Sequence, residues 1–206
     1  MFWEKINPAL KAIGRICVST TPMSICLSLT IFALGSLQPV YAQPSTEEYK
    51  VKAAFIFHFA QLVDWPPGAL GAEGRVLNLC VFEDEPHIQE LQNILDGKLI
   101  GSRVLHVRLL NRAMDRQECS ILFLSSEESR HQAETLRNFR GEPVLTIGEN
   151  ENFLSDGGII RLHLEGGRIR FDVNVGAAEL SRLKISSRLL ILATSIIHRN
   201  DMKGGQ

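Results

Sequence analysis

Residues 46–197 alternate between stretches of helical periodicity and short apolar runs. Over 46–62 apolar residues recur at helical spacing, and we expect this helix to end before Trp65-Pro66-Pro67, because proline cannot continue it. The run 119–124 is short and apolar, as in a strand buried on both faces. The pattern predicts helices over 46–62, 87–95 and 126–138, and strands over 76–82, 104–109, 119–124 and 143–147.

The C-terminal part of the pattern predicts a hairpin followed by two helices. Two strands, 159–164 and 168–173, flank Glu165-Gly166-Gly167, which favours a tight glycine turn. Because strands alternate with helices, we predict an α/β fold, a three-layer sandwich whose mainly parallel sheet is flanked by helices, with a C-terminal antiparallel hairpin. The remaining expected elements are a helical turn at 150–154, a helix at 175–183, and a helix from Ser186 or Ser187 to Ile197.

The first 42 residues have the pattern of a secretory signal peptide. Lys5, Lys11 and Arg15 precede an apolar run at 23–37, and Val40-Tyr41-Ala42 supplies the small residues that a signal peptidase recognises. The run is shorter than the roughly 20 residues that cross a bilayer, although an uncleaved anchor is the alternative. We expect a signal peptide at 1–42, a single α/β domain at 43–200 and a polar tail at 201–206, with the mature chain outside the cytoplasm.

Composition narrows the function classes further. The residues after position 42 include 19 basic and 22 acidic side chains, and this mild negative charge does not indicate nucleic acid as a partner. The chain contains no G-x-G-x-x-G, P-loop, G-x-S-x-G or H-E-x-x-H motif, so we expect no cofactor, no metal and no catalytic residues. An exported hydrolase that uses Ser125 or Ser126 is the weaker alternative.

Cys80 and Cys119 are the two cysteines that remain once the leader is removed. Two cysteines in an exported domain favour a disulfide, and neighbouring strands would bring them within bonding reach. Two buried thiols are the alternative. We do not expect zinc, since no histidine or cysteine pair lies at ligand spacing around either residue.

An aromatic group and its neighbour form the first candidate binding surface. Phe55, Phe57 and Phe59 occupy alternate positions of one predicted helix, where side chains diverge by about 160° around the axis. All three cannot lie on one buried stripe, so Phe57, together with the rigid Trp65, is a candidate contact for a partner or for a second copy of the chain. Full burial between two layers is the alternative.

Charged residues form two more candidate sites. Arg161, Arg168 and Arg170 share one face of the predicted hairpin, and guanidinium groups recognise carboxylates and phosphates, although a solvated edge is the alternative. Glu83-Asp84-Glu85 follows a strand at the sheet edge where cations bind, or else caps the helix that opens at Pro86.

Four blocks of sequence are informative when taken together. They are KAAFIFHFAQLVDWP at 52–66, LNLCVF at 77–82, CSILFLSS at 119–126, and the long segment at 144–193 that begins VLTIGENENF. In this order they resemble the YfiR-like family of exported bacterial proteins. The resemblance implies a small periplasmic domain without known catalysis. The best understood members bind the periplasmic sensor domain of an inner-membrane diguanylate cyclase and repress cyclic-di-GMP synthesis, and an OmpA-like lipoprotein can sequester them.

The resemblance also bears on individual residues. Cys80 and Cys119 match the disulfide-forming pair of the family, whereas a second pair found in some members has no counterpart here. We therefore expect a periplasmic, protein-binding regulator that acts without turnover and can form a homodimer. An exported small-molecule or anion-binding module, which would use the hairpin arginines or Glu83-Asp84-Glu85, is the alternative.

Overall fold

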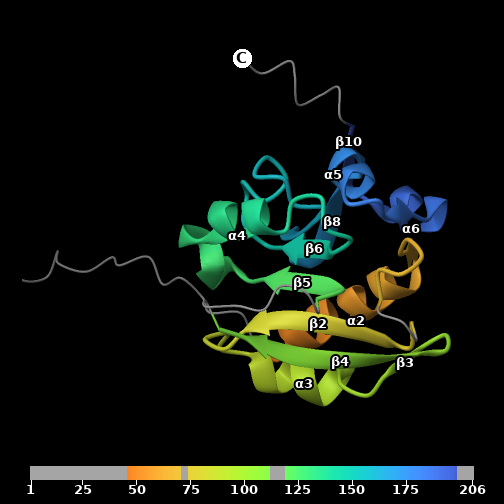
Figure 1. The fold of residues 1–206 in the computed structure, drawn as a ribbon. Coiled ribbons are helices and arrows are strands. Elements are labelled where there is room, and N and C mark those ends of the chain that lie inside the picture. Colours follow the sequence, from red (N-terminus) through yellow and green to blue (C-terminus); the bar gives the residue numbers. More distant parts are fainter. Residues whose placement is uncertain (1–45, 71–73, 112–118, 199–206) are drawn as a thin grey trace, which may run out of the picture. The chain divides into compact units, whose positions relative to one another are not determined.

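The computed structural model describes residues 46–70, 74–111 and 119–198, which lie within one compact unit, Pro44–Gln206. The predicted signal peptide at 1–42 and polar tail at 201–206 lie outside the described residues. Figure 1 shows the chain path. The helices are α2 (Thr46–Gln61), α3 (Ile88–Leu95), the short 3₁₀ helix η3 (Ser126–Arg130), α4 (Gln132–Asn138), α5 (Val175–Leu180) and α6 (Ser187–Leu192).

An eight-stranded sheet forms the centre of this unit, in the order β10-β8-β7-β6-β5-β2-β4-β3. Its inner strands pair in parallel, and antiparallel pairing is confined to β7 with β8 and to β3 with β4. The strands are β2 (Val76–Phe82), β3 (Leu99–Ile100), β4 (Arg103–Leu110), β5 (Ile121–Leu124), β6 (Leu145–Gly148), β7 (Ile160–Glu165), β8 (Arg168–Asn174) and β10 (Ser195–Ile197).

Helices cover both faces of the sheet, so the predicted three-layer α/β architecture is confirmed. In β2, Leu79 joins a core cluster with residues of α2 and α3, while its neighbour Cys80 joins a second cluster with residues of α4. Figure 1 shows α3 and α4 on opposite faces. Successive strand residues point to opposite faces, and burial on both sides explains why β2 and β5 are continuous apolar runs.

A second, two-stranded sheet fixes the end of α2. β1 (Val63–Asp64) pairs antiparallel with β9 (Lys184–Ile185), and the backbone N–H of Ser186 donates to the carbonyl oxygen of Leu62 at 2.9 Å. None of the helices in the described ranges is both long and apolar enough to traverse a membrane.

Three of the predicted helices are shorter than expected. The helix predicted at 126–138 is divided into η3 and α4 at His131, and the one predicted at 175–183 ends at Leu180, before Arg182 adopts a φ of 57°. The prediction of one helix from Ser186 or Ser187 to Ile197 was wrong for the second half of this segment. Ser186 caps α6, but the chain then becomes extended at Ala193 and adds β10 in parallel to β8.

The region predicted as a helical turn at 150–154 is a series of hydrogen-bonded turns without a helix. Phe153, which is fully buried, fixes these turns. Its ring lies between Gly148 and Gly158, at positions where a Cβ on either glycine would overlap the ring. Close packing on both sides of one aromatic ring therefore requires glycine at both places.

Candidate functional site

A disulfide joins Cys80 of β2 to Cys119, which lies just before β5. The two Cα atoms are 5.7 Å apart, within the range that disulfides require, and both residues are buried. The bond confirms the predicted pairing and connects two neighbouring central strands across a sequence separation of 39 residues.

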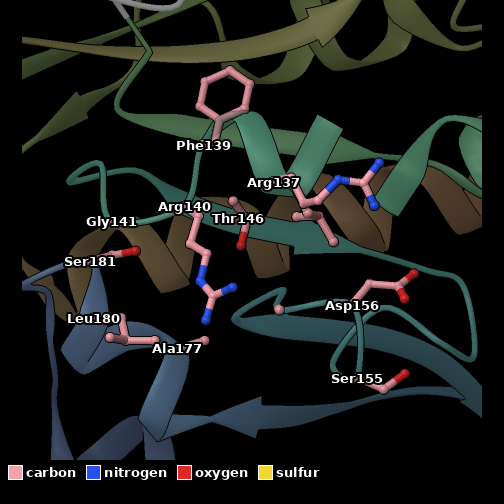
Figure 2. A pocket seen from close by; sticks show the side chains of 12 residues that line it. Arg137, Phe139, Arg140, Gly141, Thr146, Ser155, Asp156, Ala177, Leu180 and Ser181 are labelled. Atoms are coloured by element: carbon pink, nitrogen blue, oxygen red, sulfur yellow. The ribbon is translucent and has the colours of Figure 1, made fainter. Parts of the chain in front are cut away.

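A cavity of about 140 Å³ lies between the end of α4, the turn at 155–157 and α5. Figure 2 shows its lining. Apolar walls come from Leu136, Phe139, Ala177 and Leu180, and polar groups at the wall come from Arg137, Arg140, Thr146, Ser155, Asp156 and Ser181. None of these residues was predicted as a site from the sequence, because they come from four separate segments that only the fold brings together.

The hairpin of β7 and β8 has a polar and an apolar face. Its register pairs Arg161 with Asp172, His163 with Arg170, and Glu165 with Arg168, and we call these six residues the hairpin polar face. On the opposite face Phe171 packs against α2, with ring centroids 5.9 Å from Phe55 and 5.0 Å from Phe59. The predicted alternation of basic and apolar residues is therefore present in the structure.

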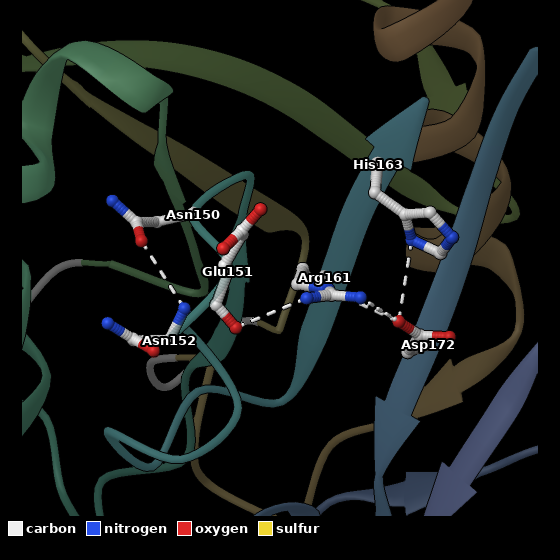
Figure 3. Close-up of polar contacts among 6 residues, drawn as sticks. All are labelled: Asn150, Glu151, Asn152, Arg161, His163 and Asp172. Atoms are coloured by element: carbon white, nitrogen blue, oxygen red, sulfur yellow. Dashed lines mark hydrogen bonds and ion pairs between the residues drawn. The ribbon is translucent and has the colours of Figure 1, made fainter. Parts of the chain in front are cut away.

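Asp172 is the centre of a cluster on the hairpin polar face (Figure 3). Its Oδ2 accepts hydrogen bonds from Nε and Nη2 of Arg161 at 3.2 and 2.7 Å, and Nδ1 of His163 lies 3.4 Å from the same oxygen. Nη1 of Arg161 donates to the carbonyl oxygen of Glu151 at 3.1 Å. Because Asp172 is buried and each side of the Arg161 guanidinium has a partner, this arginine stabilises the hairpin.

A second cavity, of about 410 Å³, adjoins this cluster. Its walls are Arg161, His163 and Asp172 of the hairpin polar face, the turn at 151–155, and β10, whose Ser195 pairs with Asp172. The wall offers a guanidinium, an imidazole and a carboxylate that already contact one another. The arginines of the hairpin that remain exposed are Arg168 and Arg170, and Nε of Arg170 lies 4.0 Å from Glu165.

A buried ionic network lies where β5 and β6 end. Nζ of Lys52 in α2 lies 2.7 Å from Oε1 of Glu149, which follows β6, and 2.8 Å from Oε1 of Glu48. Ser126, after β5, donates its backbone N–H to Oε2 of Glu149 at 3.2 Å. Burial raises the pKa of Glu149, and Lys52 opposes this effect without cancelling it.

Tyr49 extends the network to the end of β2. Its hydroxyl donates to Oε1 of Glu85 at 2.8 Å, and the same oxygen accepts from the backbone N–H of His87 at 3.3 Å. Burial, followed by the charges of Glu149 and Glu85, raises the pKa of Tyr49. Glu85, one of the three acids predicted as a cation site, is therefore buried and hydrogen-bonded within the fold, and the described residues contain no group of three or more potential metal ligands.

The aromatic candidates lie in different environments. Trp65 is only 8% exposed, and its Nε1 donates to the carbonyl oxygen of Ser120 at 3.2 Å, so its ring belongs to the core. Phe57 is half-buried against the same core, with its ring edge-on to His58. Partner binding by Phe57, Trp65, Arg161, Arg168 and Arg170 stays a prediction.

Sequence reasoning missed Lys52, although a signal was present. Lys52 lies on the same helical stripe as Tyr49, Ala53 and Ile56, which are all buried, and a lysine on such a stripe needs a buried anion. Ser125, named in the hydrolase alternative, is buried, and its hydroxyl makes no hydrogen bond within the described ranges. Among the described residues, no histidine is hydrogen-bonded to this hydroxyl, as the activation of a serine nucleophile would require.

Comparison with known proteins adds one family match. A family model described as YfiR/HmsC-like matches residues 49–194, which is more than half of the chain. Among solved structures, the chain is similar to a conserved domain protein of Vibrio cholerae O1 biovar El Tor strain N16961, with 13% identity and a TM-score of 0.46. The similarity covers 71% of this chain and 59% of that protein, and a TM-score this low does not establish a common fold.

Proposed function

The chain belongs to the YfiR/HmsC-like family, and from this premise we propose that it is a periplasmic regulator of cyclic-di-GMP synthesis. The mature protein binds the periplasmic sensor domain of an inner-membrane diguanylate cyclase and represses that enzyme. The observation that carries the proposal is the family match, which spans nearly all the described residues. The Cys80–Cys119 disulfide supports it, because such bonds persist in oxidising compartments and rarely in the cytosol.

Export is part of the proposal. Residues 1–42 act as a cleaved signal peptide, so that the mature chain begins near Gln43 and folds in the periplasm. An OmpA-like lipoprotein of the outer membrane is a second proposed partner, which would compete with the cyclase by sequestering the regulator. A homodimer that forms through α2 and Phe57 stays a prediction.

The tip of the hairpin is the proposed contact surface for the sensor domain. Arg161 is held by Asp172, so the cations that the hairpin presents to a partner are Arg168 and Arg170. Leu164, with 58% of its surface exposed, pairs with Ile169 on the opposite face of the hairpin. Arginine is enriched at protein interfaces, and two exposed guanidinium groups favour a partner surface with acidic residues.

Regulation by binding has an energetic requirement. The protein must bind the inactive state of the cyclase more tightly than the active state, since equal affinity for both states shifts nothing. A shift from about 1:99 to about 99:1 in favour of the inactive state requires about 10⁴-fold tighter binding to that state. No group on the regulator has to react for this to happen, which agrees with an expected role without turnover.

We expect deletion of the gene to raise cyclic-di-GMP in the host, and the wild-type gene to restore the lower level. The double variant Arg168→Glu/Arg170→Glu should not restore it, because reversed charges would repel an acidic partner. The matched control Lys98→Glu/Arg188→Glu reverses two exposed charges away from the hairpin tip and should restore it fully. Cyclic-di-GMP is quantified by mass spectrometry of cell extracts, with immunoblots to confirm equal protein levels.

Two results would contradict these proposals separately. An unchanged cyclic-di-GMP level after deletion, in cells that express their membrane cyclases, would exclude the repressor function. Full restoration by the hairpin double variant would exclude the hairpin tip as the contact surface but would leave the repressor function in place.

A further inference from the structure

The cavity between α4 and α5 is lined by a positively charged side chain, Arg140, that has no ionic partner among the described residues. Asp156 at its wall is occupied, because its Oδ2 accepts a hydrogen bond from Nε2 of Gln132 at 2.7 Å, and Oγ1 of Thr146 accepts from the backbone N–H of Ile159 at 3.0 Å. Arg140 differs from both. Figure 2 shows its side chain extending from the end of α4 toward Ala177 and Leu180 of α5. Within the described ranges its guanidinium has neither a hydrogen bond nor an ion pair.

The walls around Arg140 are mainly apolar. Leu136, Phe139 and Ala177 are buried, and the adjoining side chain of Leu180 is partly exposed at the mouth. Arg137, also without an ionic partner among the described residues, lies at the rim and adds a second positive charge. A cation above an apolar hollow is complementary to a molecule with an anionic end and an apolar body, because each part then meets a group of its own kind.

Size and charge together define the class of ligand. A cavity of about 150 Å³ accepts benzene in another protein, so about 140 Å³ suits a body of similar size. A guanidinium binds a carboxylate through two parallel hydrogen bonds. We propose that this cavity binds a small organic acid, with its carboxylate on Arg140 and its apolar body against Leu136, Ala177 and Leu180. The proposal does not depend on repression of a cyclase, because the cavity lies apart from the hairpin tip.

The test uses benzoate as the probe and the exported, disulfide-bonded protein. Isothermal titration calorimetry should show saturable binding of benzoate at a ratio of one to one. Arg140→Gln should weaken this binding at least tenfold, while Arg140→Lys should retain part of it, since lysine keeps the charge but lacks the planar fork. The matched control Arg188→Gln removes an exposed cation from α6 and should leave the affinity unchanged. Arg140 is exposed, so its variants are expected to fold, which circular dichroism verifies.

A second probe separates charge from shape. Inorganic phosphate carries negative charge but has no apolar body, so it should bind at least tenfold more weakly than benzoate. Equal affinity for phosphate and benzoate would overturn the assignment of the apolar walls. Benzoate binding that is absent at millimolar concentration, or that is unaffected by Arg140→Gln, would overturn the proposal as a whole.

Discussion

Lys52 is a lysine that the fold has placed almost out of contact with water. Its side chain is 5% exposed, its ammonium lies between Glu149 and Glu48, and the Tyr49 ring centroid is 4.5 Å away. A buried charge is tolerated when it is paired, whereas removal of one partner leaves the other uncompensated. The lysine therefore holds α2 to the end of β6 through electrostatics rather than through apolar contact.

Replacing this lysine tests the importance of the pair. We expect Lys52→Met to lower the free energy of unfolding by about 3 to 5 kcal/mol, because Glu149 loses its cation while it stays buried. Urea denaturation followed by circular dichroism measures the change. Lys50→Met is the control, since Lys50 contacts Glu47 on the exposed side of α2, and such surface pairs contribute about 0 to 1 kcal/mol. Equal losses in the two variants would contradict the assigned role.

Glu149 makes stability depend on pH. Burial raises its pKa above the ordinary value of 4.5, so the folded state binds a proton more tightly than the unfolded state does. Stability from this group is therefore fully present below pH 4.5 and is lost as the pH rises through the folded pKa. We expect the native protein to gain stability relative to Glu149→Gln as the pH is lowered from 7 toward 4.5, measured by urea denaturation at each pH. A difference between the two proteins that stays constant with pH would refute this.

At the scale of single elements, the sequence pattern predicted correctly those helices, strands and turns whose structure is determined by residues close together in the chain. The bounds of β2 agree with the prediction because burial on both faces makes the strand one apolar run. The hairpin was predicted from its glycine turn, and Asn174, directly before α5, caps this helix, with its Oδ1 accepting from the N–H of Ala177 at 2.9 Å. In these cases the sequence signal and the structural cause lie within a few residues of each other.

The helix prediction was wrong for the segment after α6 because the structure there is determined by a strand that is distant in sequence. Residues 187–197 are mostly apolar and contain neither glycine nor proline, so nothing local separates a helix from a strand. The outer edge of β8 decides the outcome, because it offers unpaired backbone groups to Ser195–Ile197. This edge is distant in sequence and becomes available only when the hairpin has formed.

The same distinction applies to the candidate sites. The polar face of the hairpin could be predicted from strand alternation, but the pairing of Arg161 with Asp172 depends on the register across the turn. The contact between Lys52 and Glu149, and the cavity that places Arg140 opposite α5, join segments far apart in the chain. The type of each side chain indicated which interactions it could make, but only the fold showed which residue it contacts.

At the scale of the whole molecule, the disulfide connects covalent structure with location. It joins two neighbouring strands in the middle of the sheet, and both sulfurs belong to the core on the α4 side. The family proposal requires folding in an oxidising compartment, where this bond forms. A chain retained in the reducing cytosol would have the same sequence but would lack a cross-link between two central strands.

The contribution of this cross-link can be measured on the intact protein. Closing a loop with a sequence separation of 39 residues restricts the unfolded chain, and on the chain-entropy model this stabilises the fold by up to about 4 kcal/mol. We expect Cys80→Ala/Cys119→Ala to lower the free energy of unfolding in urea by an amount of this order. Dithiothreitol should destabilise the native protein similarly and leave the double variant unchanged. If the reductant had no effect on the native protein, or acted equally on both proteins, the disulfide would not be the source of that stability.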